Sequence, residues 1–257
     1  MAENPELPLV RRFEAAGFRA WPAASVQYDG TWAIRLTAGH PAKRLNSVNP
    51  LDPGDLTSLN ERIGRAGRRF EACGRPLTFR MSPLSGARLN AHFDALGWSV
   101  FGESIVMWLG LGNAPEVEKA IDQIPLKDTG RFLRAAARTH RLGTTLRPGL
   151  SEIIGAIRAE AGLFVLEDEG EPASSLICVH DAELAGLFEV ATADDRRGKG
   201  FARRSILSAL KWAKLRGARQ AWLQVEADNR AAIGLYRSLG FADVYRYRYR
   251  QPPGAPS

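Results

Sequence analysis

A glycine-containing segment in the last third of the chain has the composition of an anion-binding loop. Residues Arg197 to Ala202 read Arg-Gly-Lys-Gly-Phe-Ala and lie between an expected strand and an expected helix. Glycines at such a junction let backbone N–H groups point at an anion, with the positive end of the helix dipole behind them. The neighbouring Arg196, Arg203 and Arg204 can add charge-assisted hydrogen bonds to phosphate. The segment therefore predicts a phosphate-binding turn.

Two familiar phosphate-binding motifs do not fit this loop. A Walker loop requires Gly-Lys-Ser/Thr, whereas Gly200 is followed by Phe201. A dinucleotide-binding fingerprint requires a third glycine and an acid about 20 residues later. Position 203 is Arg instead, and the next acid is Glu226. Two interpretations are left, a tight turn that caps a helix and a phosphate-binding loop of another kind.

Hydrophobic periodicity places this loop between a sheet and a helix. Short or alternating apolar runs predict strands, and a period near 3.6 predicts helices that end at Gly217 and Gly240. The expected fold class is α/β, with a mixed sheet of the α+β kind. The expected strands cover 164–167, 173–180, 185–192, 221–226 and 245–250, and the expected helices cover 116–123, 128–140, 151–161, 202–215 and 231–239.

The chain contains a weak internal repeat. A shift of 143 residues, without gaps, places Gly97 on Gly240 and brings the same order of strand, helix, glycine and strand into register. Such a pattern predicts two copies of one α/β unit. The Gly/Pro-containing segment 110–115 suggests the boundary, so we expect domains at 1–112 and 113–257.

The loop and the residues that follow it resemble an acyltransferase family. The loop is similar to the motif Arg/Gln-x-x-Gly-x-Gly/Ala, and Glu226-Ala-Asp-Asn229, Leu235-Tyr236 and Leu239-Gly240-Phe241 follow about 30 residues later. This combination resembles the GCN5-related N-acetyltransferase (GNAT) superfamily over about residues 160–250. The whole chain resembles bacterial two-domain members with a degenerate first half. The resemblance implies two tandem GNAT-like acyl-CoA N-acyltransferase units, acetyl-CoA as donor and an amine as acceptor.

Mapped onto this chain, the resemblance assigns the parts of a coenzyme A site. Asn229 would bind the pantetheine arm or a water molecule, and Tyr236 would lie near the coenzyme sulfur. The backbone of Val190, Ala191 and Thr192 would contact pantetheine, and the pyrophosphate would lie against Arg197, Gly198, Lys199, Gly200, Phe201, Ala202 and Arg203.

Acetyl transfer to an amine requires proton movements that carboxylates and a phenol can perform. An alkylamine is mostly protonated at pH 7, so a base must remove a proton before the nitrogen attacks a thioester. Glu189 and Glu226 both lie near the ends of expected strands, and either could be this base. The N–H of Val190 could stabilise the oxyanion, and the Tyr236 hydroxyl could protonate the departing thiolate. We expect direct sequential transfer, with both carboxylates open as the base.

The first half lacks the matching chemistry. Under the 143-residue shift the loop corresponds to Gly54–Leu59, which has Asp55 where phosphate would lie. Tyr236 corresponds to Phe93, Asn229 to Gly86 and Glu189 to Asn46. We therefore expect residues 1–112 to be non-catalytic, and either structural or one wall of the acceptor site.

Composition narrows the class of protein. The 257 residues are 45% hydrophobic and 25% charged, and charged residues interrupt every apolar run that could span a membrane. Cys73 and Cys178 are far apart, and the four histidines have no metal-ligand spacing. We expect no disulfide framework and no metal. Since the N-terminus does not resemble a secretory signal, a soluble cytoplasmic protein is expected.

Two rival functions come from other classes. The net charge is +7, and the segment from Arg196 to Arg219 has nine basic residues and no acid, so it could bind nucleic acid. A compact patch fits a nucleotide phosphate better than a duplex. The second rival is a non-catalytic acyl-CoA-binding sensor, against which Glu189 and Tyr236 in one half argue. No motif sets the acceptor, the length of the acyl group or the oligomeric state.

Overall fold

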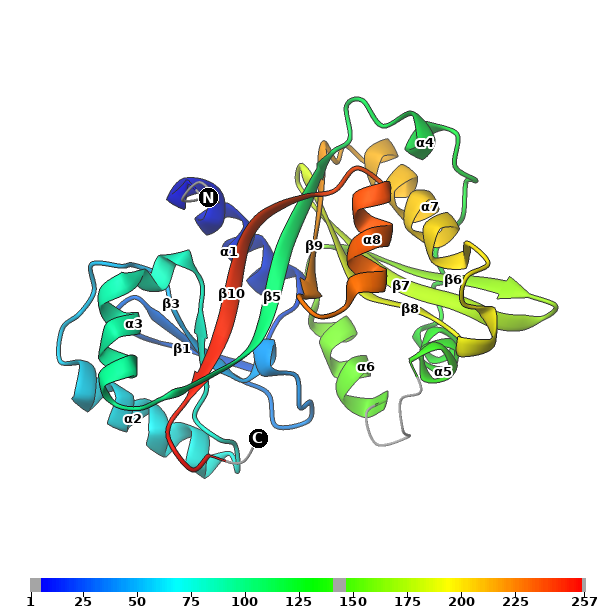
Figure 1. The fold of residues 1–257 in the computed structure, drawn as a ribbon. Coiled ribbons are helices and arrows are strands. Elements are labelled where there is room, and N and C mark those ends of the chain that lie inside the picture. The colour runs from blue at the N-terminus through cyan, green and yellow to red at the C-terminus, as the bar shows by residue number, and fades with distance from the viewer. Residues whose placement is uncertain (1–5, 141–146, 256–257) are drawn as a thin grey trace. The chain divides into compact units, whose positions relative to one another are not determined.

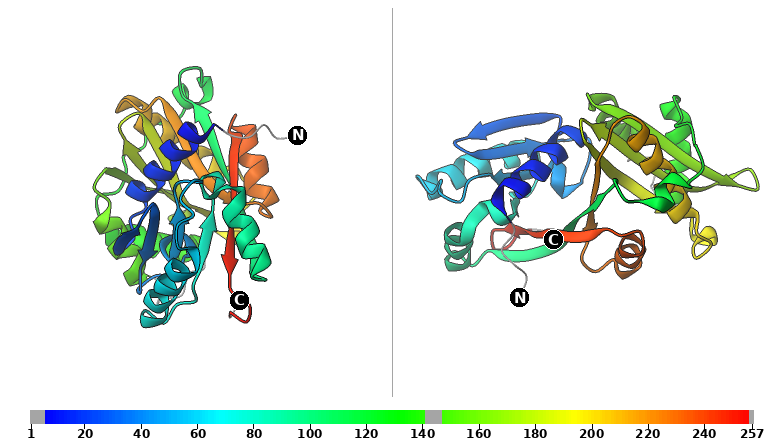
Figure 2. Two further views of the ribbon diagram at one scale, coloured as in Figure 1. Left: turned by 90° about the vertical axis from the view of Figure 1, so that its left-hand side faces the viewer. Right: turned by 90° about the horizontal axis from the view of Figure 1, so that it is seen from above.

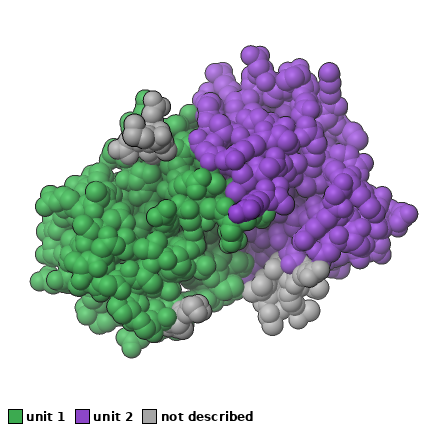
Figure 3. Space-filling model, in the orientation of Figure 1, with its two compact units in different colours: residues 1–106, 225–229, 244–257 green, residues 107–224, 230–243 purple. Residues whose placement is uncertain are grey.

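The computed structural model describes residues 6–140 and 147–255 and divides the chain into two compact units. The first unit contains residues 1–106, 225–229 and 244–257, and the second contains 107–224 and 230–243 (Figure 3). Neither unit is continuous in sequence. The expected division into a non-catalytic 1–112 and a catalytic 113–257 stays a prediction.

The first unit is a mixed sheet with strand order β1-β2-β3-β4-β10-β5. Strands β3 and β4 are parallel, and their neighbours on either side pair antiparallel. Helices α2 and α3 supply Phe70 and Phe93 to a core in which Phe79 contacts Trp32 edge to face, with ring centroids 5.2 Å apart. The elements are α1 (Leu7–Ala20), β1 (Ser25–Asp29), β2 (Trp32–Leu36), η1 (Lys43–Leu45), β3 (Ser47–Pro50), α2 (Leu59–Ala72), β4 (Phe79–Met81), η2 (Pro83–Ser85), α3 (Gly86–Ala95), most of β5 (Ser99–Gly110) and most of β10 (Ala242–Gln251).

The second unit has strand order β5-β9-β8-β7-β6. Strands β6, β7 and β8 form antiparallel hairpins, whereas β8 and β9 are parallel because helix α7 connects them. Helices α5 and α7 both pack on β7 (Figures 1 and 2). The elements are α4 (Pro115–Glu118), α5 (Thr129–Thr139), α6 (Arg147–Ala156), β6 (Glu160–Asp168), β7 (Glu171–Asp181), β8 (Leu184–Thr192), η4 (Asp194–Arg196), α7 (Phe201–Leu215), most of β9 (Gln220–Glu226) and α8 (Arg230–Ser238).

The C-terminal strand β10 completes the first unit. Arg248 lies opposite Met81 of β4 in an antiparallel register. The Tyr245 hydroxyl donates to Oε1 of the buried Glu14 at 2.6 Å, and the Glu14 carboxylate also pairs with the buried Arg80. The first unit is therefore built from both ends of the chain.

The structure confirms that the expected strands and helices of the last third exist, and it corrects two helices. The helix expected over 116–123 covers only Pro115–Glu118. The helix expected over 151–161 ends at Ala156, and residues 160–168 form β6 instead. Strand β6 pairs antiparallel with β7 from Glu171 to His180.

The internal repeat predicts corresponding elements correctly. A shift of 143 residues carries α2 onto 202–215, where α7 covers Phe201–Leu215, and carries the start of β5 onto residue 242, where β10 begins. Gly97 and Gly240, which follow α3 and α8, both have positive φ angles, +69° and +91°. The fold is therefore mixed α/β with the same unit twice.

Candidate functional site

The glycine loop forms an open turn at the start of α7. Gly198 and Gly200 have φ angles of +74° and +79°, which side-chain-bearing residues rarely adopt. A Cβ atom added at either glycine would meet no atom within 4 Å, so the turn is not packed against other parts of the protein. Gly200 is the N-cap of α7, and no side chain caps the helix. The uncapped amides and the helix dipole make this terminus suited to an oxyanion.

The basic residues of the loop have different partners. Arg196 is largely buried and pairs with Asp168 at 3.0 Å and Glu169 at 2.9 Å, so it holds the loop to the β6–β7 turn. Arg197 and Lys199 are exposed beside the glycines. The loop fits the motif at its fixed positions, because Arg197, Gly200 and Ala202 have the spacing Arg-x-x-Gly-x-Ala.

Ion pairs reduce the charge of the basic patch at 196–219. Seven of its nine lysine and arginine residues lie 2.5–3.4 Å from a carboxylate oxygen of the second unit. Since each pair offsets a positive charge, the patch is less cationic in the fold than in the sequence. The paired residues are Arg196, Arg197, Arg203, Lys211, Lys214, Arg216 and Arg219.

Strand β8 carries a bulge at Glu189. Its register with β7 shifts between the Ile177–Phe188 and Ser175–Ala191 pairs, and Glu189 has a φ of +49°, unusual for a residue with a side chain. The parallel register with β9 covers Leu184–Leu187 and stops before the bulge. The later β8 residues, Val190, Ala191 and Thr192, are half-buried and lie outside that register, so backbone groups there can face a ligand.

Histidine 140 contacts the bulge. Its Nε2 lies 2.9 Å from the Glu189 backbone oxygen, and the same nitrogen lies 4.0 Å from Glu189 Oε2. Helix α5 ends beside the bulge, because the hydroxyls of Thr139 and Ser175 lie 2.6 Å apart. Sequence reasoning missed this contact, since His140 has no metal or triad spacing and is 49 residues from Glu189. No sequence signal could have found it without the fold.

Tyr236 lies inside α8 and is almost fully buried. Its ring contacts Phe241 edge to face, with centroids 5.9 Å apart. Burial raises the pKa of the Tyr236 hydroxyl to about 12, so the phenol stays protonated at neutral pH. A buried neutral phenol can donate a hydrogen bond or a proton, and it can also simply fill the core.

Two predicted site residues fall in the segment assigned to the first unit. Glu226 ends β9 and is exposed, and its backbone oxygen accepts from the Asn229 N–H at 3.0 Å. Asn229 directly precedes α8. The predicted roles of Glu226 as base and Asn229 as pantetheine ligand stay predictions.

In the corresponding loop of the first unit, the Asp55 side chain occupies the turn. Asp55 accepts from the Thr31 N–H at 2.9 Å and pairs with the buried Arg62 at 2.8 Å. Hydrogen bonds from Arg62 and Thr31 lower the pKa of Asp55 to about 2, against the opposing effect of desolvation. Gly86 lies against Pro53, whose Cβ would be 2.7 Å from a Cβ at that glycine. An anion would therefore meet a carboxylate here.

The other two first-half counterparts are structural. Asn46 is buried, accepts from the Thr37 N–H at 2.8 Å and donates to the His40 carbonyl at 2.7 Å. Phe93 stacks on Trp98 with ring centroids 4.4 Å apart. Both side chains stabilise the fold through packing and backbone hydrogen bonds.

Other reactive groups are buried or dispersed. Cys178 is buried, which raises the pKa of its thiol far above the usual value and makes it a poor nucleophile. Within residues 6–140 and 147–255, no three His, Cys, Asp or Glu side chains gather as a metal site would require. Over the same residues, the structure contains no helix with the length and apolar character needed to cross a membrane.

Comparison with known proteins gives a consistent result. Residues 132–241 match the family model described as Acetyltransferase (GNAT) family. The uncharacterized N-acetyltransferase YobR of Bacillus subtilis (strain 168) is 24% identical over 252 residues, which cover 94% of this chain and 98% of that protein.

Two solved structures match almost the whole chain. A GCN5-related N-acetyltransferase from Kribbella flavida has a TM-score of 0.69 at 16% identity, over 95% of each chain. A tandem GNAT protein from the clavulanic acid biosynthesis pathway has a TM-score of 0.64 at 15% identity, over 95% of this chain and 88% of that one. At these identities the likeness concerns the fold, and it extends over both units.

Proposed function

Because the chain belongs to the GNAT superfamily, we propose that its second unit transfers an acetyl group from acetyl-CoA to an amine. The observation that carries the proposal is the open, uncapped start of α7 with left-handed Gly198 and Gly200, next to a bulged strand that carries Glu189. The match to the GNAT family model and the similarity to an N-acetyltransferase support a transferase. The acceptor and the residue roles are the proposal.

The second unit has residues that fit the cofactor. The amides at the start of α7 would hold the pyrophosphate, with the exposed Arg197 and Lys199 beside them. Backbone groups of Val190, Ala191 and Thr192 would bind the pantetheine arm. When bound, acetyl-CoA supplies a thioester carbonyl that an amine can attack.

Glu189 is the proposed base. Its bulged backbone lies outside the register with β9, and its carboxylate is mostly shielded, with 17% of the side chain exposed. A carboxylate in such a place can take the proton that a protonated amine must lose before attack. His140 Nε2 holds the Glu189 carbonyl and so fixes the left-handed backbone that aims this side chain. We propose His140 as a positioning residue, and Glu226 remains the alternative base.

The Tyr236 hydroxyl is the proposed proton donor to the leaving thiolate. Its pKa of about 12 keeps the proton on the phenol until negative charge develops nearby. The backbone N–H of Val190, next to the bulge, is the proposed donor to the oxyanion. These roles make the transfer direct, without an acyl-enzyme, which agrees with the burial of Cys178.

Calorimetric titration of the full chain with acetyl-CoA tests the proposal. We expect micromolar binding by the wild type and a loss of about 100-fold or more in Gly200→Asp, because a carboxylate would occupy the helix amides and repel phosphate. Gly254→Asp is the matched control, since Gly254 also has a positive φ and open surroundings but lies in the first unit. Equal affinity of both variants would contradict the proposed site.

The basic patch supports this function better than nucleic-acid binding, because most of its arginines and lysines are already ion-paired. Acceptors can be screened by release of the coenzyme thiol from acetyl-CoA, with small amines, amino acids, aminoglycosides, peptide N-termini and lysine peptides as candidates. Binding of acetyl-CoA without thiol release by any amine would instead favour the acyl-CoA sensor.

A further inference from the structure

The first unit contains a hollow at the carboxyl ends of its parallel strands. Residues after β3 and β4 line a cavity of about 500 Å³, and an adjoining one of about 260 Å³ shares Met81, Asn90 and Arg246 with it. Ligands of open α/β sheets bind at this end of the strands. The 143-residue shift carries Gly86 of its wall onto Asn229, so the hollow corresponds in position to the proposed coenzyme site of the second unit.

The walls of the larger cavity combine apolar surface with one cation. Leu7, Pro53, Pro83 and Ala87 supply the apolar part, and the half-exposed guanidinium of Arg246 supplies the charge. Helix α3 begins in this wall without a side-chain cap, so its dipole adds positive potential. This combination fits a small organic anion, and Asp55 in the neighbouring loop is unfavourable for a nucleotide phosphate chain.

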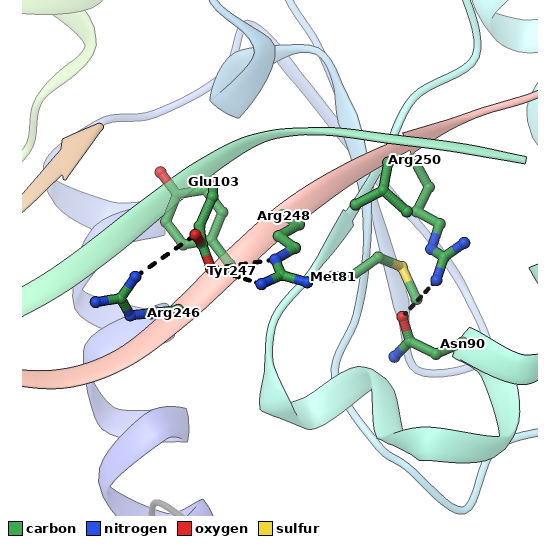
Figure 4. Close-up of a pocket in the computed structure, with 8 residues that line it drawn as sticks. Met81, Asn90, Glu103, Arg246, Tyr247, Arg248 and Arg250 are labelled. Carbon is green, nitrogen blue, oxygen red and sulfur yellow. Dashed lines mark hydrogen bonds and ion pairs between the residues drawn. The ribbon is translucent and has the colours of Figure 1, made fainter. Parts of the chain in front are cut away.

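Three arginines of β10 surround the smaller cavity (Figure 4). Arg246 and Arg248 lie on two sides of the Glu103 carboxylate, with contacts of 3.5 Å and 2.9 Å. Arg250 is buried and is held by Asp94 at 2.6 Å. Arg248 makes the closer contact with Glu103, so that carboxylate keeps a cationic partner when Arg246 also contacts a ligand.

We propose that the first unit binds a short organic carboxylate, which places its acid group on Arg246 and its apolar body against Leu7, Pro53 and Pro83. The planar guanidinium can donate to both carboxylate oxygens, and the apolar wall distinguishes an organic acid from inorganic phosphate. The cavity volume lies within the range of small-molecule sites, so it has room for an organic acid the size of benzoate. The ligand would bind whether or not the second unit transfers acetyl groups.

Ligand-observed NMR titration of the full chain tests this proposal with benzoate as the probe. We expect saturable millimolar binding of benzoate, and binding at least about tenfold weaker for benzamide, which keeps the ring but lacks the charge, and for inorganic phosphate. Benzamide or phosphate binding as tightly as benzoate would overturn the proposal, as would the absence of saturable benzoate binding.

Variants distinguish binding at this cavity from non-specific attraction of benzoate to positive charge. Arg246→Gln should weaken benzoate binding at least about tenfold. Arg88→Gln should leave it unchanged, because Arg88 is exposed on α3 and lines neither cavity. Ala87→Trp should block the cavity from an exposed helix position without removing charge, which keeps the test valid if Arg246→Gln unfolds. Benzoate binding that survives in Ala87→Trp, or that Arg88→Gln weakens as much as Arg246→Gln does, would overturn the proposal.

Discussion

The start of α2 in the first unit and the start of α7 in the second correspond under the 143-residue shift, but the two turns differ in backbone conformation and in content. In the first, Asp55 fills the turn and pairs with Arg62 and Thr31. In the second, Gly198 stands at the corresponding position, and the helix is uncapped and open. The comparison indicates that one carboxylate can fill the position where the second unit has its proposed anion site, while the fold stays the same.

The largest expected effect comes from moving that carboxylate into the second unit. Gly198→Asp copies Asp55 into the open turn and should weaken acetyl-CoA binding by about 100-fold or more, measured by calorimetry. Gly198→Asn is the control, because asparagine tolerates left-handed backbone but carries no charge. If the two variants lose affinity equally, backbone strain rather than charge separates the two turns.

Tyr236→Phe makes the second unit resemble the first, where Phe93 stands at this position. Loss of the proton donor should lower kcat by about 100-fold, with the KM for acetyl-CoA within about twofold of the wild type. Steady-state kinetics of thiol release measures both constants. An unchanged kcat would assign Tyr236 to packing alone, as its contact with Phe241 allows.

Removal of Asp55 tests the same comparison by changing the turn of the first unit. Asp55→Ala leaves the buried Arg62 with one carboxylate fewer and should lower the free energy of unfolding by about 1–3 kcal/mol at pH 7, measured with urea. The pKa of Asp55 is lowered from 3.8 to about 2, so its stabilisation is complete above pH 4. The stability difference between wild type and variant should therefore shrink as the pH falls from 4 to 2. A difference that stays constant over this range would show that Asp55 stabilises the turn by other means.

The smallest expected effect concerns the positioning of Glu189. His140→Ala should lower kcat by about threefold to tenfold without raising the KM for acetyl-CoA, since only the Glu189 carbonyl contact is lost. His140→Gln, which can donate through its side-chain amide, should recover part of that loss. No recovery, together with an altered acidic limb of the pH–kcat profile, would indicate that the imidazole takes part in proton transfer.

The sequence was sufficient for the repeat and the glycine loop, because both depend on local residue types. Glycine at 97 and 240 marks helix ends, and alternation at 245–250 marks a strand, whatever surrounds them. The sequence did not predict that β10 joins the first unit. Its pairing with β4 depends on contacts such as Tyr245 to Glu14, which are 231 residues apart.

For the candidate site, the sequence predicted individual residues but not the contacts between segments that are distant in the sequence. The two glycines and the candidate base Glu189 follow from their position at a strand end. The bulge at Glu189 and its contact with His140 do not, because a left-handed φ at a glutamate has no signature in residue types. The closed first-unit turn was anticipated from Asp55, but its partners Thr31 and Arg62 come from other elements.

The place of β10 in the first unit also sets an order of assembly. A ribosome makes every residue of the second unit, up to 243, before it makes residues 244–251, which pair with β4. The N-terminal part of the chain must therefore wait for its last strand while the later unit can already fold. A premature stop codon just after residue 243 would damage the earlier half of the protein and spare the later one.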